Sequence, residues 1–190
     1  MLAIAPNATL LVVDVQKGFD EPSWGKRNNP LMEARLVELL RAWRETRRPI
    51  LHFQHMSMRA GSPLRPGQAG NELKPEATPL PGEPLIAKRV NSCFIGTSLE
   101  ADLRRRSVDE IVIAGLTTNH CVSTTARMAG NLGFTAWVVS DATAAFDRTG
   151  PDGREHPAEL IHSIALADLH GEFATVVDTR TVLAGLGGRS

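Results

Sequence analysis

The chain of 190 residues has no tyrosine, only two cysteines and few aromatic residues, which make up 5% of the sequence. Two cysteines are too few for a disulfide-stapled scaffold, which favours a reducing compartment and predicts a cytoplasmic protein. No basic segment followed by an unbroken apolar stretch opens the chain, so we expect no signal peptide. The scarcity of aromatic side chains also disfavours a binding site built as an extensive aromatic cage.

Net charge and long apolar runs are absent as well. Lysine plus arginine equals aspartate plus glutamate at 21 each, so no net positive field attracts nucleic acid or anionic lipid. No uninterrupted apolar run approaches the roughly 18 residues that a membrane-spanning helix needs. We therefore expect neither a nucleic acid nor a membrane as a partner.

The length suits one ordinary domain with its own core. We expect a single domain over residues 1–190, with its core at about 9–178 and a tail over 179–190. Short apolar runs predict strands over 9–13, 50–54, 85–87, 110–114, 135–140 and 174–177. Apolar residues at helical spacing predict helices over 31–47, 97–106, 120–132 and 157–169.

This alternation of strands and helices predicts an α/β fold. Successive βαβ units give a three-layer αβα arrangement, with an open, mainly parallel six-stranded sheet and helices on both faces. The segment 56–84 is rich in glycine and proline and shows no period. Long loops of this kind are usually functional or mobile, and we expect this one to contact a second subunit.

Three chemically reactive residues follow predicted strands. Asp14 ends the first strand, Lys88 ends the third, and Cys121 follows the fourth after a tight turn. Ligands of open α/β sheets gather at the carboxyl ends of the strands, so we expect these side chains to converge. The helix that starts near Cys121 should lower the pKa of its thiol, and the turn offers N–H groups to an oxyanion. Asp14 would then accept the thiol proton, and Lys88 would favour the thiolate.

Each of these residues also has an ordinary structural interpretation. Cys121 suits a small buried core position, Asp14 suits a turn after a strand, and Lys88 suits a charged surface. The occurrence of all three at strand ends favours a site.

The motifs around these residues resemble those of a known family. They are Val12-Val13-Asp14-Val15-Gln16, Lys88-Arg89-Val90-Asn91-Ser92-Cys93-Phe94 and Gly115-Leu116-Thr117-Thr118-Asn119-His120-Cys121. In order and spacing they are similar to the motifs of isochorismatase-like cysteine hydrolases, closest to ureidoacrylate and streptothricin-type amidohydrolases. The resemblance runs from about Thr9 to Val177.

The resemblance implies a catalytic triad of Asp14, Lys88 and Cys121. It also implies a cis peptide bond between Leu116 and Thr117, with the N–H groups of Thr117 and Cys121 forming an oxyanion hole. The implied reaction is hydrolysis of a C–N bond in a small amide, carbamoyl or ureido substrate through a thioester. Isochorismatases proper lack the cysteine, so Cys121 favours C–N hydrolysis. The resemblance further implies a homo-oligomer, either a dimer or a tetramer.

The sequence departs from the metal-dependent nicotinamidases of this superfamily. Where those enzymes carry an Asp-x-His motif, this chain has Gln54-His55-Met56-Ser57-Met58. His55 has no carboxylate neighbour in this stretch, and His52 should point to the opposite face of its strand. One imidazole does not make a metal site, so we expect no metal and no cofactor.

Five further residues are candidates for substrate binding. Gln16, Phe19 and Trp24 follow the first strand and should lie near the mouth of the pocket. Phe94 and Asn119 are expected to line the acyl site by analogy with the family.

The roles of two other residues stay open. Cys93 is a secondary candidate for the nucleophile, and His120 suits a packing or subunit-contact role. The alternatives to a hydrolase are a redox sensor, which usually needs a second, resolving thiol, and a crevice that only binds a small molecule. The presence of Asp14 and Lys88 favours the hydrolase, because binding alone needs no base beside a thiol.

Overall fold

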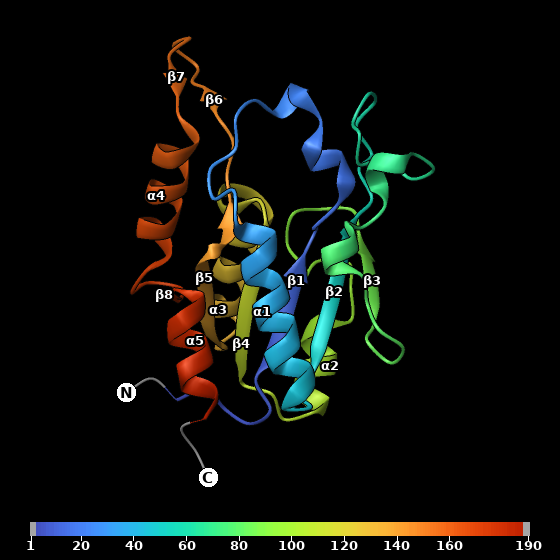
Figure 1. The fold of residues 1–190 in the computed structure, drawn as a ribbon, viewed down its shortest axis with the longest axis vertical. Helices are drawn as coiled ribbons and strands as arrows, with labels where there is room; N and C mark the ends of the chain where they lie inside the picture. Colours follow the sequence, from blue (N-terminus) through green and yellow to red (C-terminus); the bar gives the residue numbers. More distant parts are fainter. Residues whose placement is uncertain (1–2, 188–190) are drawn as a thin grey trace.

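The computed structural model describes residues 3–187 and has a six-stranded, fully parallel sheet at its centre (Figure 1). The strands lie in the order β3-β2-β1-β4-β5-β8. Their bounds are β1 Thr9–Val13, β2 Ile50–His55, β3 Leu85–Lys88, β4 Glu110–Leu116, β5 Thr135–Ala144 and β8 Thr175–Val177. The predicted α/β class and the six-stranded parallel sheet are confirmed.

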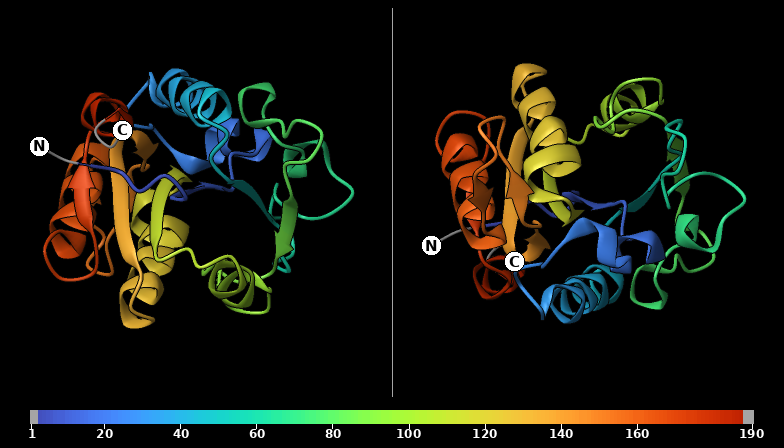
Figure 2. Two further views of the ribbon diagram at one scale, coloured as in Figure 1. Left: turned by 90° about the horizontal axis from the view of Figure 1, so that it is seen from below. Right: turned by 90° about the horizontal axis from the view of Figure 1, so that it is seen from above.

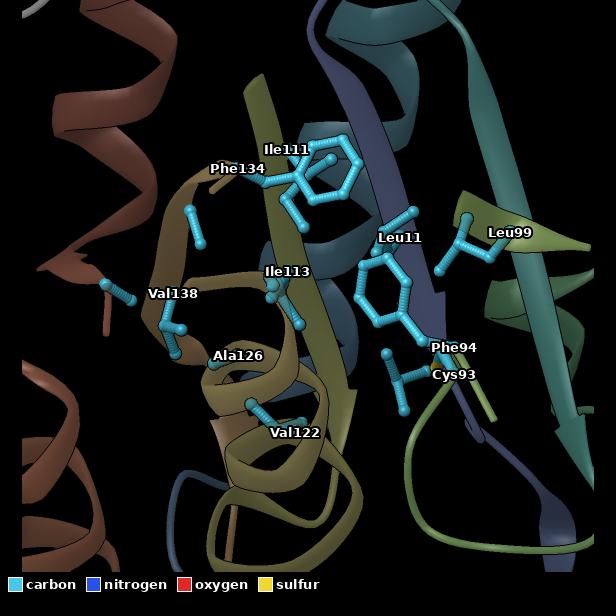
Figure 3. Close-up of a cluster of buried hydrophobic side chains, with 14 of the residues drawn as sticks. Leu11, Cys93, Phe94, Leu99, Ile111, Ile113, Val122, Ala126, Phe134 and Val138 are labelled. Carbon is cyan, nitrogen blue, oxygen red and sulfur yellow. The ribbon is translucent and has the colours of Figure 1, made fainter. Parts of the chain in front are cut away.

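Helices cover both faces of the sheet (Figure 2). Their bounds are α1 Met32–Glu45, α2 Leu99–Arg105, α3 Ser123–Asn131, α4 Ala158–Leu169 and α5 Thr179–Leu186. Successive residues of β1 alternate between the faces, because side chains of a strand point to opposite sides. Leu10 and Val12 pack in the cluster formed with α1 and α5. Leu11 and Val13 pack in the cluster formed with α2 and α3 (Figure 3).

The strand order places a crevice at the carboxyl end of the sheet. From β1 the chain runs outward to β2 and β3, and it then returns to place β4 on the other side of β1. Such a reversal leaves room above the adjacent strands, and ligands of open α/β sheets bind there. Residues 17–24, the loop after β2 and the β6–β7 hairpin all lie at this end (Figure 1).

The expected tail over 179–190 is wrong for its first part. Thr179–Leu186 forms α5, whose Val182 is buried against the sheet. The side chain of Asp178 accepts a hydrogen bond from the Thr181 N–H at 2.7 Å and so caps the helix. The end of the expected tail, 188–190, lies outside the described residues.

One short hairpin departs from the prediction, whereas the segment 56–84 forms the predicted loop. The connection between β5 and α4 contains a two-stranded antiparallel hairpin, β6 Arg148–Thr149 and β7 Glu155–His156. The segment 56–84 contains only two 3₁₀ turns, Ala69–Asn71 and Pro75–Ala77, and otherwise forms loop.

Gly115 is required where β4 runs closest to β1. It has φ of +121°, and a Cβ atom at this position would lie 2.1 Å from the Val13 carbonyl oxygen. Because that neighbour is backbone and cannot turn away, Gly115→Ala is expected to destabilise the protein by about 3 kcal/mol or more. Thermal unfolding measures the loss. Gly133→Ala is the matched control, since Gly133 also has positive φ but no atom within 4 Å. An equal, small Tm shift for both variants would contradict the steric argument.

Candidate active site

A buried ion pair joins the ends of β1 and β3. Lys88 Nζ donates to Asp14 Oδ2 at 2.6 Å, and both side chains are fully buried. Asp14 takes φ of +51°, a left-handed conformation that aspartate tolerates better than most residues. Its second oxygen, Oδ1, is buried without a hydrogen-bond partner among residues 3–187. Asp14 therefore keeps one oxygen free to accept a proton.

Cys121 lies beside this pair, in the π-helical turn Thr118–Val122 that leads into α3. Its sulfur, an Asp14 oxygen and a His55 ring nitrogen all lie within 4.8 Å of one another. Irregular turns of this type are frequent at functional sites. The topology thus brings together the three residues that the strand ends predicted, since Lys88 is bonded to Asp14.

The expected low pKa of the Cys121 thiol is wrong. Burial raises the pKa of Cys121, the charge of Asp14 raises it further, and the opposing effect of Lys88 is too small to compensate. Desolvation disfavours the charged thiolate and is the largest of the effects on this pKa. Cys121 is therefore a neutral thiol in the free protein and needs a base during attack.

Lys88 stays charged in this environment. Burial is the largest single effect and lowers the pKa of Lys88, but the charges of Asp14, Cys121 and Cys93 and the hydrogen bond to Asp14 together hold the pKa above its usual value. Lys88 also donates to the Val90 carbonyl oxygen at 3.2 Å. These contacts orient the ammonium group toward Asp14.

His55 has a carboxylate neighbour after all. The sequence places none close to His55 along the strand, but the parallel sheet brings Asp14, which directly follows β1, beside the end of β2. The Nδ1 atom of His55 lies 3.5 Å from Lys88 Nζ, and burial lowers the pKa of the His55 imidazole. His55 is therefore neutral at neutral pH. His52 is separate from it, with Nε2 3.0 Å from Glu83.

Asp14, His55 and Cys121 form the one cluster within residues 3–187 whose geometry suits a metal ion. The Lys88 ammonium occupies one oxygen of Asp14 and approaches the ring of His55. A fixed positive charge at this distance opposes a bound cation. The cluster therefore fits proton transfer better than metal binding.

A buried histidine, His162, contacts the turn that contains Cys121. The Leu116–Thr117 peptide bond is cis. His162 of α4 contacts Thr118 through Nδ1 at 2.8 Å, and its Nε2 lies 3.4 Å from the Asn29 side-chain nitrogen. No sequence motif pointed to His162, because its role depends on where α4 packs.

Next to Cys121 is a cavity of about 500 Å³, a volume typical of small-molecule sites. Phe19 and Trp24 line it, and their ring centroids lie 4.9 Å apart. His120 lines it as well, with Nδ1 3.2 Å from Thr117 Oγ1. Two arginines that belong to no sequence motif, Arg59 and Arg148, complete its charged lining.

Three expected substrate-binding residues lie elsewhere. Gln16 is fully buried and donates to the Asn71 carbonyl at 2.8 Å, so it holds loops together. Phe94 belongs to the core, where its ring lies 5.7 Å from that of Phe134 (Figure 3). Asn119 lines a separate groove between α3 and α4.

Cys93 is a core residue in the described structure. Its side chain is fully buried, and burial raises the pKa of its thiol to about 12. The Cys93 N–H donates to Thr125 Oγ1 at 3.1 Å. It lies in the buried cluster with Leu11 and Val122 (Figure 3). It is not among the residues that line the cavity.

The fold is a doubly wound parallel sheet, and a thiol, a carboxylate and a lysine lie where its strand order reverses. These features define the class: an α/β protein with the site of a cysteine hydrolase. Residues 8–181 match the family model of the Isochorismatase domain. The chain therefore belongs to the isochorismatase family. Within residues 3–187, no helix combines the length and apolarity needed to span a bilayer.

Individual relatives agree with this assignment. The uncharacterized isochorismatase family protein YrdC of Bacillus subtilis (strain 168) is 46% identical over 170 residues, which cover 90% of this chain and 91% of YrdC. The ureidoacrylate amidohydrolase RutB of Methylobacterium radiotolerans is 29% identical, with 98% of this chain and 82% of RutB covered.

Solved structures show the same fold. An isochorismatase-family protein from Chromobacterium violaceum superposes with a TM-score of 0.95 at 43% identity, covering 100% of this chain and 98% of that one. A cysteine hydrolase from Pseudomonas syringae pv. phaseolicola superposes with a TM-score of 0.88 at 25% identity, covering 99% and 96%.

Proposed function

We propose that the protein is a metal-independent cysteine hydrolase that cleaves a C–N bond of a small amide, carbamoyl or ureido substrate. The observation that carries the proposal is the buried Asp14 carboxylate beside the Cys121 thiol, with Lys88 bonded to one of its oxygens and the other oxygen unpartnered within the described residues. A neutral thiol needs a base within reach, and here a carboxylate is present beside it. The names of two relatives, an amidohydrolase and a cysteine hydrolase, agree with this chemistry.

The first half of the reaction forms a thioester. Asp14 accepts the thiol proton as the Cys121 sulfur attacks the substrate carbonyl carbon, and the negative charge moves to the carbonyl oxygen. The N–H groups of Thr117 and Cys121 are the proposed donors to this oxyanion. The intermediate then breaks its C–N bond, and Asp14 returns the proton to the leaving nitrogen, so an amine or ammonia departs.

The second half releases the acid. Asp14 takes a proton from a water molecule, which attacks the thioester carbon, and collapse of the intermediate breaks the C–S bond. Cys121 recovers its proton and the acyl group leaves as a carboxylic acid. Lys88 holds the Asp14 carboxylate in position throughout these steps, through the ion pair at 2.6 Å.

The properties of the two thiols argue against a redox sensor, the alternative to a hydrolase. Redox-sensing cysteines are accessible and have lowered pKa values, whereas burial raises the pKa of both Cys121 and Cys93. A sensor would need the thiolate form that this environment disfavours.

Ammonia release from a panel of small amides tests the proposal. The panel contains nicotinamide, N-carbamoyl amino acids and ureidoacrylate-like compounds. Cyclic amides, whose ring opening frees no ammonia, are followed by mass spectrometry of the ring-opened product. The protein is first treated with a chelator and desalted. We expect release from at least one class at the untreated rate, and none with Cys121→Ala. Loss of turnover on chelation, restored by added metal, would contradict the metal-independent mechanism.

A further inference from the structure

The lining of the cavity carries an excess of positive charge. Arg59 comes from the loop after β2, and Arg148 comes from β6, on the hairpin between β5 and α4. The carboxylate in the lining is Asp14, and Lys88 already neutralises it. Two arginine residues from segments far apart in the sequence thus line one cavity, and no unpaired carboxylate lies in the lining.

Neither arginine has a carboxylate within ion-pair distance among residues 3–187. The contrast within the hairpin is direct: Arg154 pairs with Asp152 at 3.3 Å, whereas Arg148 has no such partner. Arg148 also acts on the cavity wall, because burial and then the charge of Arg148 lower the pKa of His120. Its charge therefore reaches the cavity interior.

The remaining lining is neutral and suits a compact ligand. Phe19 and Trp24 form an apolar wall, which continues to Phe146 with ring centroids of Trp24 and Phe146 5.6 Å apart. Ser57 and Asn91 add uncharged polar groups. A volume of about 500 Å³ admits a small molecule with a polar end at each side of a short apolar body.

We propose that Arg148 and Arg59 bind a carboxylate of the substrate, remote from the bond that Cys121 attacks. The guanidinium group matches a carboxylate because its planar N–H donors form two parallel hydrogen bonds. The substrates are then half-amides or ureido derivatives of small carboxylic acids, and neutral amides of the same size are poor substrates. This inference rests on the proposed function for the bond that is cleaved, but the carboxylate site itself does not depend on turnover.

Matched pairs of compounds test the proposal by activity. Half-amides of malonic to adipic acid and N-carbamoyl amino acids are each compared with their methyl esters, which keep the size and remove the charge. We expect kcat/KM at least about 10-fold higher for the free acids, and a 10- to 100-fold loss with Arg148→Gln, mainly in KM. Arg59→Gln should act in the same direction. Arg154→Gln, on the same hairpin but outside the cavity lining, is the control and should leave both compounds unchanged.

A binding measurement separates this inference from the hydrolase proposal. Calorimetric titration of Cys121→Ala with succinate, glutarate and adipate should show binding that Arg148→Gln, introduced into the same variant, weakens at least about 10-fold. Turnover without preference for acids and without an effect of Arg148→Gln would overturn the carboxylate site and leave the hydrolase standing. Arg148-dependent binding without any turnover would do the reverse. Absence of both binding and preference overturns the inference.

Discussion

Cys121→Ala is expected to lower turnover of any amide substrate at least about 10⁴-fold, because no other group on the cavity wall can form the thioester. The protein should keep its fold, since the variant removes a single sulfur atom from a side chain that lines the cavity. Ammonia release at saturating substrate measures the first effect, and circular dichroism with thermal unfolding measures the second.

Cys93→Ala is the matched control for this experiment. Its thiol lies in the core, so the variant should lose about 1 kcal/mol of stability and keep near wild-type turnover. The account fails if Cys93→Ala is inactive while folded and Cys121→Ala still turns over substrate.

Lys88→Met is expected to cost both stability and activity. Removing the ammonium leaves the Asp14 carboxylate fully buried without its partner, which costs about 3–5 kcal/mol, or roughly 10 °C in Tm for a chain of this size. The carboxylate then takes up a proton to avoid a buried charge, and a protonated Asp14 cannot act as the base. We expect turnover at neutral pH to fall at least about 10³-fold.

The double variant Asp14→Asn/Lys88→Met separates the two effects. Replacing both members of a buried ion pair removes the uncompensated charge, so much of the lost stability should return. Turnover should stay at the level of the inactive single variants, because the base is absent. A double variant that recovers activity together with stability would show that the pair serves only the fold.

The sheet and the convergence of Asp14, Lys88 and Cys121 could be predicted from the sequence. Short β-branched runs between helical patterns indicate parallel strands, and residues at the ends of parallel strands share one edge of the sheet. The prediction worked because it depends on strand order along the chain and not on loop conformation.

Other parts of the site depend on packing, which the sequence does not display. The pKa of Cys121 follows from its burial, and the nearness of His55 to Asp14 follows from the register of β1 on β2. Arg59 and Arg148 lie on a loop and a hairpin whose courses no periodic pattern encodes. The expected homo-oligomer and cytoplasmic location stay predictions.

The sequence does carry a pattern that predicts helix α5. Val182, Leu183 and Leu186 are spaced for one helical face, and Asp178 precedes them at a capping position. The glycines at the end of the chain made the segment resemble a frayed terminus.

Capture of the acyl-enzyme tests the central claim most directly. The wild-type protein is mixed with an excess of a substrate identified by ammonia release, quenched in acid within the first turnover, and examined by intact-mass and peptide mass spectrometry. The account predicts a mass increase equal to the acyl group, located on the peptide that contains Cys121 and removed by hydroxylamine as a hydroxamate. Ammonia release without any adduct, and without hydroxamate when hydroxylamine is present during turnover, would mean that water attacks the substrate directly and would contradict the thioester mechanism.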